Sequence, residues 1–351
     1  MTKHYRIAFV FPAIYMGGAE KVLFNLASAF QRQGHSTALF SLKAPDIELP
    51  EDLPQPEVLR TYFRYLPKAF RLWQLRRLIE ANERKYGDFD LVLSNLHTRK
   101  PFVRKNLDRL FYYLHLINPT PDSQYIERLS RYYRGKQVIA VSQGVKDAFL
   151  KLPGMKPASV SMIYNGFDFE GIRHQAEAFK PGVDELYLIH VGRFDPLKRH
   201  DLLFDAYQRL KNPPKLVLLV QPTETLHQLI AEYGLTDRVI LPGLQSNPFP
   251  WIKQAKALIL SSDFEAFGNV VLEALVCGTP VVGTETIGPL EILTGDLAQW
   301  LCPLNDPTAL AEKIQRVLDE PYSIPAEALK PFDMKTVLPQ YFSLIEQAAV
   351  R

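Results

Sequence analysis

The sequence predicts an α/β fold of two doubly wound, Rossmann-like domains that face a central cleft. First, short runs of β-branched and aliphatic residues alternate with segments of helical period, which is typical of parallel sheets covered by helices. Second, this alternation runs through two complete series, separated by a charged, irregular stretch at 168–184. Third, 351 residues with 47% hydrophobic composition can bury two ordinary cores.

The elements follow in order along the two series. The strand-like runs of the first are RIAFVF, STALFSL, FDLVLSN, LFYYLHL and KQVIAVS, and its clearest helix is GGAEKVLFNLASAFQRQG. The second contains LYLIHVGRF, KLVLLVQ, RVILPG, ALILSS and PVVGTE, with helices in RHDLLFDAYQRL and VVLEALVCG. We therefore expect domains at 1–167 and 168–330. A last helix near Met334–Ala349, within 331–351, should pack back on the first domain.

Composition excludes little by itself. The 41 basic residues nearly cancel the 38 acidic ones, so the net charge of +3 gives no indication of a nucleic-acid partner. Two cysteines cannot brace a chain of this length, which favours a reducing, cytoplasmic compartment. The N-terminus resembles a first strand rather than a cleaved leader, and no apolar run approaches the roughly eighteen residues of a membrane span. We expect a protein that is soluble or lies on a membrane surface.

Basic residues gather in the first 110 positions. Eight arginines and lysines fall between Arg60 and Lys85, against Glu80 and Glu83 alone. The segment YFRYLPKAFRLWQLRRLIEANERK mixes these cations with aromatics and leucines. It fits an ordinary amphipathic helix with a solvated basic face, and it also fits a helix that rests on anionic lipid.

Residues after one strand of the second domain indicate a diphosphate site. Gly192, Arg193 and Lys198 follow the strand in LYLIHVGRF and precede a helix. Arginine offers a planar fork of donors and lysine a point charge, so both can converge on a diphosphate. A solvated loop with incidental basic residues gives the same spacing, although a lysine at a helix start is unfavourable unless an anion binds there.

Two glutamates surround a similar junction further along, in DFEAFGNVVLEALVCGTPVV. The strand ALILSS ends there, and the next helix should start near Asn269. The backbone N–H groups at such a start suit phosphate oxygens, and here they belong to Phe267, Gly268, Asn269 and Val270. Glu273, one turn in, is placed to accept hydrogen bonds from a ribose, and Glu265 from sugar hydroxyls. The alternative is that Glu265 caps the helix and Glu273 lies on its solvated face.

Together these stretches resemble glycosyltransferase family 4, the retaining nucleotide-sugar enzymes of the GT-B fold. GRFDPLKRHDLL and SSDFEAFGNVVLEALVCGTPVV carry the resemblance, and MGGAEKVLFNLASAFQRQGH, VIAVSQGVKDAFL and IYNGFD extend it over nearly the whole chain. By this resemblance, Arg193 and Lys198 hold the donor diphosphate and stabilise its charge as the sugar leaves. Glu265 would bind the transferred sugar, and Glu273 the ribose.

The resemblance also assigns four further positions. Gly17 and Gly18 would form a loop that closes near the phosphates and the acceptor. His115, in LFYYLHLINP, matches a histidine that lies beside the transferred sugar in the family, and His97, in LSNLHTRK, is the competing candidate. Backbone groups near Leu244 would contact the donor base.

Two stretches depart from what a glycosyltransferase motif would require. Where the family often has GDGP, this chain has Gln221–Thr225, which leaves the wall of the donor pocket and the identity of the sugar open. The DFD at Asp88–Asp90 imitates the metal-binding Asp-x-Asp motif, but it precedes a strand and so lies at the amino end of the sheet. Cationic side chains and a helix start on the diphosphate make a metal unnecessary, so we expect no metal and no cofactor.

The resemblance therefore implies a retaining, hexosyltransferase-type enzyme. Its donor would be a nucleotide-sugar, with UDP-sugars favoured, and its acceptor a lipid-linked or phosphorylated glycan of lipopolysaccharide or another cell-surface polysaccharide. The leaving phosphate would take the acceptor's proton on the front face of the sugar. Three alternatives stay open: a sugar-nucleotide epimerase of the same shape, a glycan phosphorylase, and a non-catalytic nucleotide-sugar binder or membrane scaffold. The expected location is cytoplasmic, with peripheral attachment to the cytoplasmic face of the inner membrane if the basic helix meets lipid.

Overall fold

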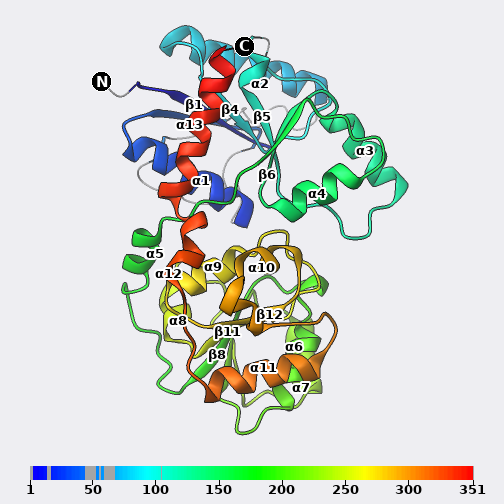
Figure 1. Ribbon diagram of the computed structural model, residues 1–351, viewed down its shortest axis with the longest axis vertical. Coiled ribbons are helices and arrows are strands. Elements are labelled where there is room, and N and C mark those ends of the chain that lie inside the picture. Colours follow the sequence, from blue (N-terminus) through cyan, green and yellow to red (C-terminus); the bar gives the residue numbers. More distant parts are fainter. Residues whose placement is uncertain are drawn as a thin grey trace. The chain divides into compact units, whose positions relative to one another are not determined.

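The computed structural model of the chain describes residues 3–13, 17–43, 53–54, 57–58, 68–103 and 105–350 (Figure 1). Contacts divide the chain into two compact units: unit 1 comprises 1–167 with 332–351, and unit 2 comprises 168–331. Each unit contains one parallel sheet flanked by helices (Figure 1). The predicted α/β class with two doubly wound domains is confirmed.

Unit 1 is built on a seven-stranded sheet. The strand order is β3-β2-β1-β4-β5-β6-β7, and the strands are β1 (Arg6–Phe11), β2 (Ser36–Ser41), β3 (Glu57–Val58), β4 (Leu91–Ser94), β5 (Leu110–Leu114), β6 (Gln137–Ala140) and β7 (Ser159–Met162). β1 is an interior strand, where Phe9 pairs with Leu39 on one side and Leu93 on the other. Its apolar run is buried because helices cover the faces of the sheet.

The helices of unit 1 follow from apolar residues at helical spacing. They are α1 (Gly18–Arg32), α2 (Lys68–Tyr86), α3 (Ser123–Tyr133), α4 (Gln143–Lys151) and α13 (Met334–Val350), with a 3-10 turn at Leu107–Arg109. In α1, Val22, Leu23, Leu26 and Phe30 are buried along one stripe. Residues 59–67, which carry the start of the predicted basic segment, lie outside the described residues.

The last helix belongs to unit 1, although it follows unit 2 in the sequence. In Figure 1, α13 lies beside α1. Phe342 stacks on Tyr5, with ring centroids 5.7 Å apart, and meets Phe30 edge to face. The hydroxyls of Tyr341 and Tyr113 hydrogen-bond at 2.5 Å. Aromatic packing and this buried bond therefore hold the C-terminal helix on the first sheet.

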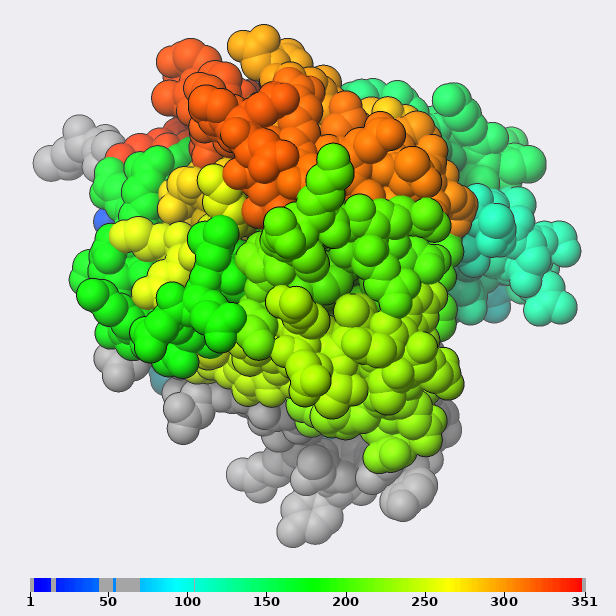
Figure 2. All heavy atoms as spheres, turned by 90° about the horizontal axis from the view of Figure 1, so that it is seen from below, coloured from blue at the N-terminus to red at the C-terminus, as the bar shows by residue number. Residues whose placement is uncertain are grey.

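Unit 2 repeats the pattern with a six-stranded sheet. Its order is β10-β9-β8-β11-β12-β13, and the strands are β8 (Tyr187–Val191), β9 (Lys215–Leu219), β10 (Val239–Ile240), β11 (Ala257–Leu260), β12 (Val281–Thr284) and β13 (Leu301–Cys302). Its helices are α5 (Phe169–Gln175), α6 (His200–Gln208), α7 (Glu224–Glu232), α8 (Phe249–Gln254), α9 (Asn269–Val276), α10 (Ile287–Ile292), α11 (Pro307–Asp319) and α12 (Ala326–Leu329), with 3-10 turns at Pro196–Lys198, Gly295–Trp300 and Lys330–Phe332. Figure 2 shows the orange residues of α11 against the green residues of α6.

One expectation for this unit is wrong. The charged stretch expected to be irregular at 168–184 begins with helix α5. Asp168 caps it by accepting a hydrogen bond from the Gly171 N–H at 3.0 Å, and Phe169 and Ile172 are buried. A capping aspartate and two buried apolar residues outweigh the charged residues that follow them.

In each sheet the chain reverses its winding beside a central strand. The reversal falls between β1 and β4 in unit 1, and between β8 and β11 in unit 2. In open parallel sheets, ligands bind outside the carboxyl ends of the strands at this switch point. The loops after β8 and β11 carry the predicted donor residues, so the topology itself brings them together.

Candidate functional site

Two of the predicted donor residues contact each other at the switch point of unit 2. Lys198 Nζ and Glu265 Oε1 form an ion pair, with side chains 22% and 12% exposed. Ser262 Oγ donates a second hydrogen bond to the same carboxylate oxygen at 2.9 Å. Glu265 therefore does not cap α9, and the capping alternative is wrong. The cap position is Gly268, and no side chain accepts a cap hydrogen bond there.

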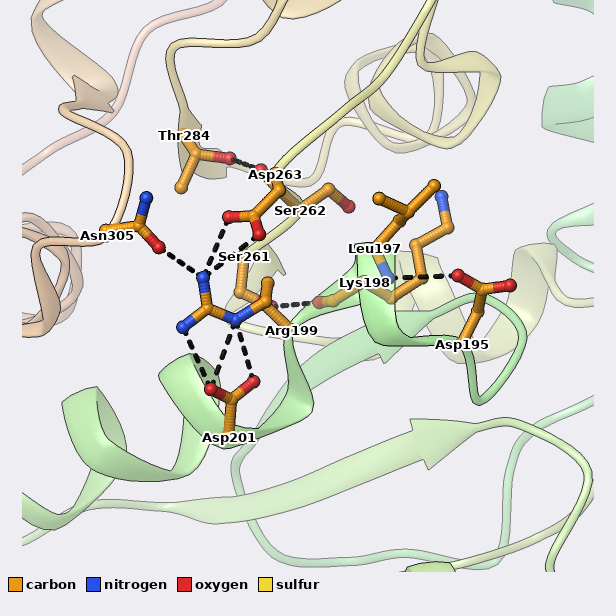
Figure 3. Close-up of polar contacts among 10 residues, drawn as sticks. All are labelled: Asp195, Leu197, Lys198, Arg199, Asp201, Ser261, Ser262, Asp263, Thr284 and Asn305. Atoms are coloured by element: carbon orange, nitrogen blue, oxygen red, sulfur yellow. Dashed lines mark hydrogen bonds and ion pairs between the residues drawn. The ribbon is translucent and has the colours of Figure 1, made fainter. Parts of the chain in front are cut away.

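Hydrogen bonds to backbone carbonyls join the two loops that carry this ion pair (Figure 3). Ser261 Oγ donates to the Lys198 carbonyl at 2.8 Å, and the Asp263 N–H donates to the Leu197 carbonyl at 2.9 Å. Thr284, from the end of β12, donates to the Ser262 carbonyl at 2.5 Å. The loop after β11 thus forms hydrogen bonds with residues that follow β8 and with the end of β12, the two strands beside it.

The two remaining residues of the predicted diphosphate loop are Arg193 and Gly192. Arg193 is exposed, and its guanidinium makes no hydrogen bond with any described residue. A Cβ on Gly192 would meet His190 Nε2 at 3.5 Å and Lys198 Cε at 3.7 Å, which are ordinary contacts. Arg193 is therefore available to an anionic ligand, whereas crowding does not require a glycine at position 192.

The start of α9 is shaped by two glycines. Gly268 has φ +86°, the left-handed conformation that turns the chain into the helix. Phe267 is buried, and Gly288 of α10 packs so closely that a Cβ there would overlap the Phe267 carbonyl. Glu273 lies one turn into α9 and is half-buried. The structure thus places Phe267, Gly268, Asn269 and Val270 at a helix start, where sequence analysis expects the phosphate.

Leu244 is not joined to this cluster. It follows β10, the edge strand, which is separated from β8 by β9. Its side chain is 62% exposed, and Gln245 donates to the Pro242 carbonyl at 3.1 Å within the same loop. Contact of this loop with a donor base stays a prediction.

Two buried histidines beneath the diphosphate loop were missed by sequence analysis. His190 lies on β8 and His200 begins α6, with ring centroids 4.7 Å apart. His190 donates from Nδ1 to the Ile259 carbonyl at 2.9 Å, while its Nε2 and both nitrogens of His200 find no partner among the described residues. Burial, the charge of His200 and that of the nearby Lys198 lower the pKa of His190 to about 3. Burial and the charge of Lys198 lower the pKa of His200 to about 4. Both rings are neutral at physiological pH.

In unit 1, both candidate histidines lie at the carboxyl ends of neighbouring strands. His115 follows β5, donates from Nε2 to Asn95 Oδ1 at 2.7 Å and stacks on Tyr113 at 5.2 Å. Burial, with a smaller effect from His97, lowers the pKa of His115 to about 3. His97 follows β4, is exposed and hydrogen-bonds the Tyr133 hydroxyl at 3.0 Å. Each ring is therefore oriented by a hydrogen bond, and the His115 ring is neutral.

The glycine pair lies at the start of α1, at the switch point of unit 1. Gly17 is the cap residue and Gly18 the first residue of the helix, while residues 14–16 lie outside the described residues. The Glu20 carboxylate folds back so closely that a Cβ on Gly17 would displace it. Burial raises the pKa of Glu20. Glu20 is a further polar group at this loop that the sequence analysis does not name.

The DFD stretch lies where the sequence analysis expects it. Asp88–Asp90 immediately precede β4, and Asp90 Oδ2 accepts a hydrogen bond from the Arg6 N–H at 2.9 Å at the start of β1. Asp90 thus ties two strand starts together at the amino end of the sheet. Among the described residues, no group of three or more histidine, cysteine, aspartate or glutamate side chains could hold a metal ion.

A pocket of about 420 Å³ lies elsewhere in unit 2. It is lined by Arg173, Lys253 and the residues Leu275–Gly278 at the far end of α9 from Gly268. Lys253 pairs with Glu177, and Arg173 donates to the Val276 carbonyl at 3.4 Å. The cations of this pocket are already engaged, and the predicted donor residues do not line it.

Comparison with known proteins agrees with the geometry. The model for "Glycosyltransferase Family 4" matches residues 16–170, and the model for "Glycosyl transferases group 1" matches residues 173–331. The two parallel sheets have the GT-B fold, and both family models are those of glycosyltransferases. The chain belongs to glycosyltransferase family 4.

Among curated relatives, an N-acetylgalactosaminyltransferase of Campylobacter jejuni, named for a diphospho-undecaprenol acceptor, is 28% identical over 54% of this chain and 52% of its own. A lipopolysaccharide core biosynthesis glycosyltransferase of Rhizobium meliloti is 30% identical over 39% of this chain and 40% of its own. The chain spans about half the length, or less, of these relatives. An uncharacterised glycosyltransferase of Methanocaldococcus jannaschii is 26% identical over 90% of this chain and 88% of its own.

Solved structures match over almost the whole chain. HepE of Anabaena, in complex with UDP and glucose, superposes with a TM-score of 0.77 at 21% identity, covering 98% of this chain and all of that one. The lipopolysaccharide outer core galactosyltransferase WaaB superposes with a TM-score of 0.69 at 20% identity, covering 98% of this chain and 99% of that one. At this identity the likeness shows the fold alone.

Proposed function

We propose that the protein is a retaining glycosyltransferase that moves a sugar from a nucleotide-sugar, preferably a UDP-sugar, to a glycan or glycolipid acceptor of the cell surface. The Lys198–Glu265 ion pair at the start of α9 carries the proposal, because it sets a cation and a carboxylate side by side at a helix start. A diphosphate needs the first, and sugar hydroxyls need the second. Relatives named for lipopolysaccharide core and diphospho-undecaprenol substrates support an acceptor of that type.

Binding of the donor would exchange the partners of these two side chains. The diphosphate, held by Arg193 and the N–H groups at the start of α9, would attract the Lys198 ammonium away from Glu265. Glu265 would then accept hydrogen bonds from the sugar, and Glu273 from the ribose. As the sugar leaves, Lys198 and Arg193 stabilise charge on the departing phosphate, and a phosphate oxygen takes the acceptor's proton on the same face. His115, neutral and oriented by Asn95, is proposed to contact the transferred sugar.

The proposal needs no metal ion, since Arg193, Lys198 and the helix start supply the positive charge. Transfer should therefore persist in excess chelator. Loss of transfer in EDTA, with recovery on adding magnesium or manganese, would contradict this part of the proposal.

A thermal-shift screen with UDP-, GDP- and ADP-sugars tests the donor assignment. A ligand at a hundred times its dissociation constant should stabilise the native state by about 2.7 kcal/mol. Hits are then incubated with lipid-linked glycans, and products are analysed by NMR for the anomeric configuration. Retained configuration supports the proposal. A change of the donor sugar without acceptor indicates the epimerase, a need for orthophosphate indicates the phosphorylase, and a thermal shift without turnover indicates the binder.

We further propose that α2 places the enzyme on anionic lipid at the cytoplasmic face of the membrane. No described helix is long and apolar enough to cross a bilayer. Instead, α2 exposes Phe70 and Trp73, with ring centroids 5.3 Å apart, and the Arg77 guanidinium lies 5.1 Å above the Trp73 ring. Leu75 and Ile79 are buried on the opposite side. Aromatic rings beside arginine suit the interface of an anionic membrane.

Vesicle flotation tests this contact. Wild-type protein should float with phosphatidylglycerol vesicles at low salt and less with phosphatidylcholine vesicles. Trp73→Ala and Arg77→Gln should each weaken flotation, whereas Lys211→Gln, an exposed cation of unit 2, should not. Equal flotation of all four proteins would leave α2 as an ordinary solvated helix.

A further inference from the structure

We infer that Arg199 is a positioning residue that fixes Lys198 and Glu265 relative to each other by tying three loops together. The inference rests on the proposed function, because it concerns the geometry of the proposed donor site. Arg199 lies directly between Lys198 and the buried His200, at the cap position of α6. Neither composition nor motif distinguishes this arginine from its basic neighbours.

The backbone at Arg199 is in a conformation that a long side chain rarely adopts. Its φ of +49° and ψ of +56° are left-handed, which favours glycine or asparagine. Such a residue persists only where its surroundings hold it in place. The turn sends the side chains of Lys198 and Arg199 in different directions, as Figure 3 shows. Lys198 reaches Glu265, and the Arg199 guanidinium faces the opposite way.

The guanidinium contacts a different element on each side. Nε and NH2 donate to the Asp201 carboxylate of α6 at 2.9–3.1 Å. NH1 donates to both Asp263 oxygens at 2.9 and 3.0 Å, and also to Asn305 Oδ1. These hydrogen bonds to Asp201, with those to Asp263, raise the pKa of Arg199. All three guanidinium nitrogens of Arg199 donate hydrogen bonds, and its side chain is 23% exposed.

The Asp263 contact gives Arg199 its link to the site. Asp263 is two residues before Glu265, and its N–H already donates to the Leu197 carbonyl at 2.9 Å. The ion pair with Asp263 adds a further link between the same two loops, on the side of the chain opposite the Lys198 side chain. Asn305, itself at φ +59°, extends the tie to the loop before α11. Without the guanidinium, the loops would be joined by the Asp263–Leu197 and Ser261–Lys198 hydrogen bonds and by the Lys198–Glu265 ion pair itself.

Three variants separate this role from general stabilisation. Arg199→Gly relieves the backbone strain while removing the tie, so its melting temperature should stay near that of wild type. Asp263→Asn removes the ion pair and keeps the backbone bond. Asp201→Asn is the matched control, because it removes a carboxylate from the same guanidinium but one that lies within α6.

Two measurements are made on each variant. Amide exchange of Asp263 and Gly288, which bond across this region, should be about tenfold faster in Arg199→Gly and Asp263→Asn, with the rest of unit 2 unchanged. Calorimetry with UDP should give an affinity about three- to tenfold weaker for those two variants. Asp201→Asn should match wild type in both. If Arg199→Gly and Asp263→Asn behave like Asp201→Asn, the inference is wrong. If wild-type protein does not bind UDP, the proposed donor is wrong, and the exchange rates alone still decide the role of Arg199.

Discussion

Lys198 and Glu265 neutralise each other before any donor arrives, and this pairing decides how each should respond to substitution. Their side chains are 22% and 12% exposed, so solvent screens the ion pair only in part. Removing either one leaves the other in a site shaped for a partner. A bound donor would give each side chain a new partner, its diphosphate for Lys198 and its sugar hydroxyls for Glu265.

Lys198→Ala should lower kcat by about 10²–10³-fold, the usual scale for one electrostatic contact in a transition state. Folding should survive, because the backbone bonds of this loop to Ser261 and Asp263 remain. Steady-state kinetics with the identified donor, beside the exposed control Lys211→Ala, measure the effect. Turnover equal to wild type would remove Lys198 from the mechanism.

The two glutamates should fail differently. Glu273→Gln should weaken both UDP and the intact donor by about 1.5–3 kcal/mol, because both ligands carry the ribose. Glu265→Gln should weaken only the donor, and it should bind UDP as well as or better than wild type, because Lys198 is released. Calorimetric titration with both ligands distinguishes the variants. Parallel losses in both would contradict the assignment of one glutamate to ribose and the other to sugar.

At the scale of elements, the contact between α10 and the loop before α9 has the least room for change. The Gly288 N–H donates to the Glu265 carbonyl at 2.9 Å, and the Gly288 Cα lies against the Phe267 backbone. No flexible side chain can move aside to admit a methyl group. The position of the Glu265 loop therefore depends on a glycine from another helix.

Gly288→Ala should displace this loop, lowering both the thermal stability of the protein and its affinity for the donor. Gly278→Ala tests the difference between crowding and strain, since Gly278 has φ +84° but open space around it. It should lower the melting temperature and leave the ligand affinity near wild type. Unchanged donor binding in Gly288→Ala would show that the loop tolerates displacement.

The same elements show how far the sequence leads. β1, β8 and β11 are predominantly apolar runs, so their existence and the residues at their ends follow from the pattern. The two-residue strands β3 and β13 carry too few residues to show any period. Helix α11 has a proline at its first turn after capping Asp306, a start signal that the sequence analysis did not use.

Within the site, residues with chemical character could be predicted and their supports could not. Lys198 and Glu265 stand at recognisable strand ends, and they do meet. Arg199 is in a left-handed conformation that its residue type argues against. Gly288 contacts Phe267 in the loop before α9, which no local spacing in the sequence indicates. Such contacts depend on tertiary packing, which cannot be read from the hydrophobic periodicity of the sequence.

For the molecule as a whole, the buried histidine pair predicts a loss of stability in acid. The folded pKa values, about 3 for His190 and about 4 for His200, lie below the ordinary value of 6.5. The unfolded chain therefore binds more protons as the pH falls below 6.5, and the unfolding free energy should decrease between pH 6.5 and about 4. From pH 7 to pH 5 the decrease should reach about 2 kcal/mol for each histidine.

Urea unfolding at pH 7 and pH 5 measures this dependence, with fluorescence as the readout. His200→Gln should show a smaller difference between the two pH values than wild type, because glutamine does not titrate. An identical difference in both proteins would place the acid sensitivity elsewhere in the chain.

The return of α13 to unit 1 has a consequence for how the protein is made. Unit 2 is one continuous stretch, 168–331, whereas unit 1 lacks α13 until residues 332–350 have been translated. At about 5–20 residues per second, a ribosome adds the intervening stretch in roughly ten to forty seconds. During that interval Tyr5, Phe30 and Tyr113 lack their contacts with Phe342 and Tyr341 of α13. Unit 2 can therefore complete its fold first, whereas the nascent unit 1 stays accessible to chaperones until α13 has been synthesised.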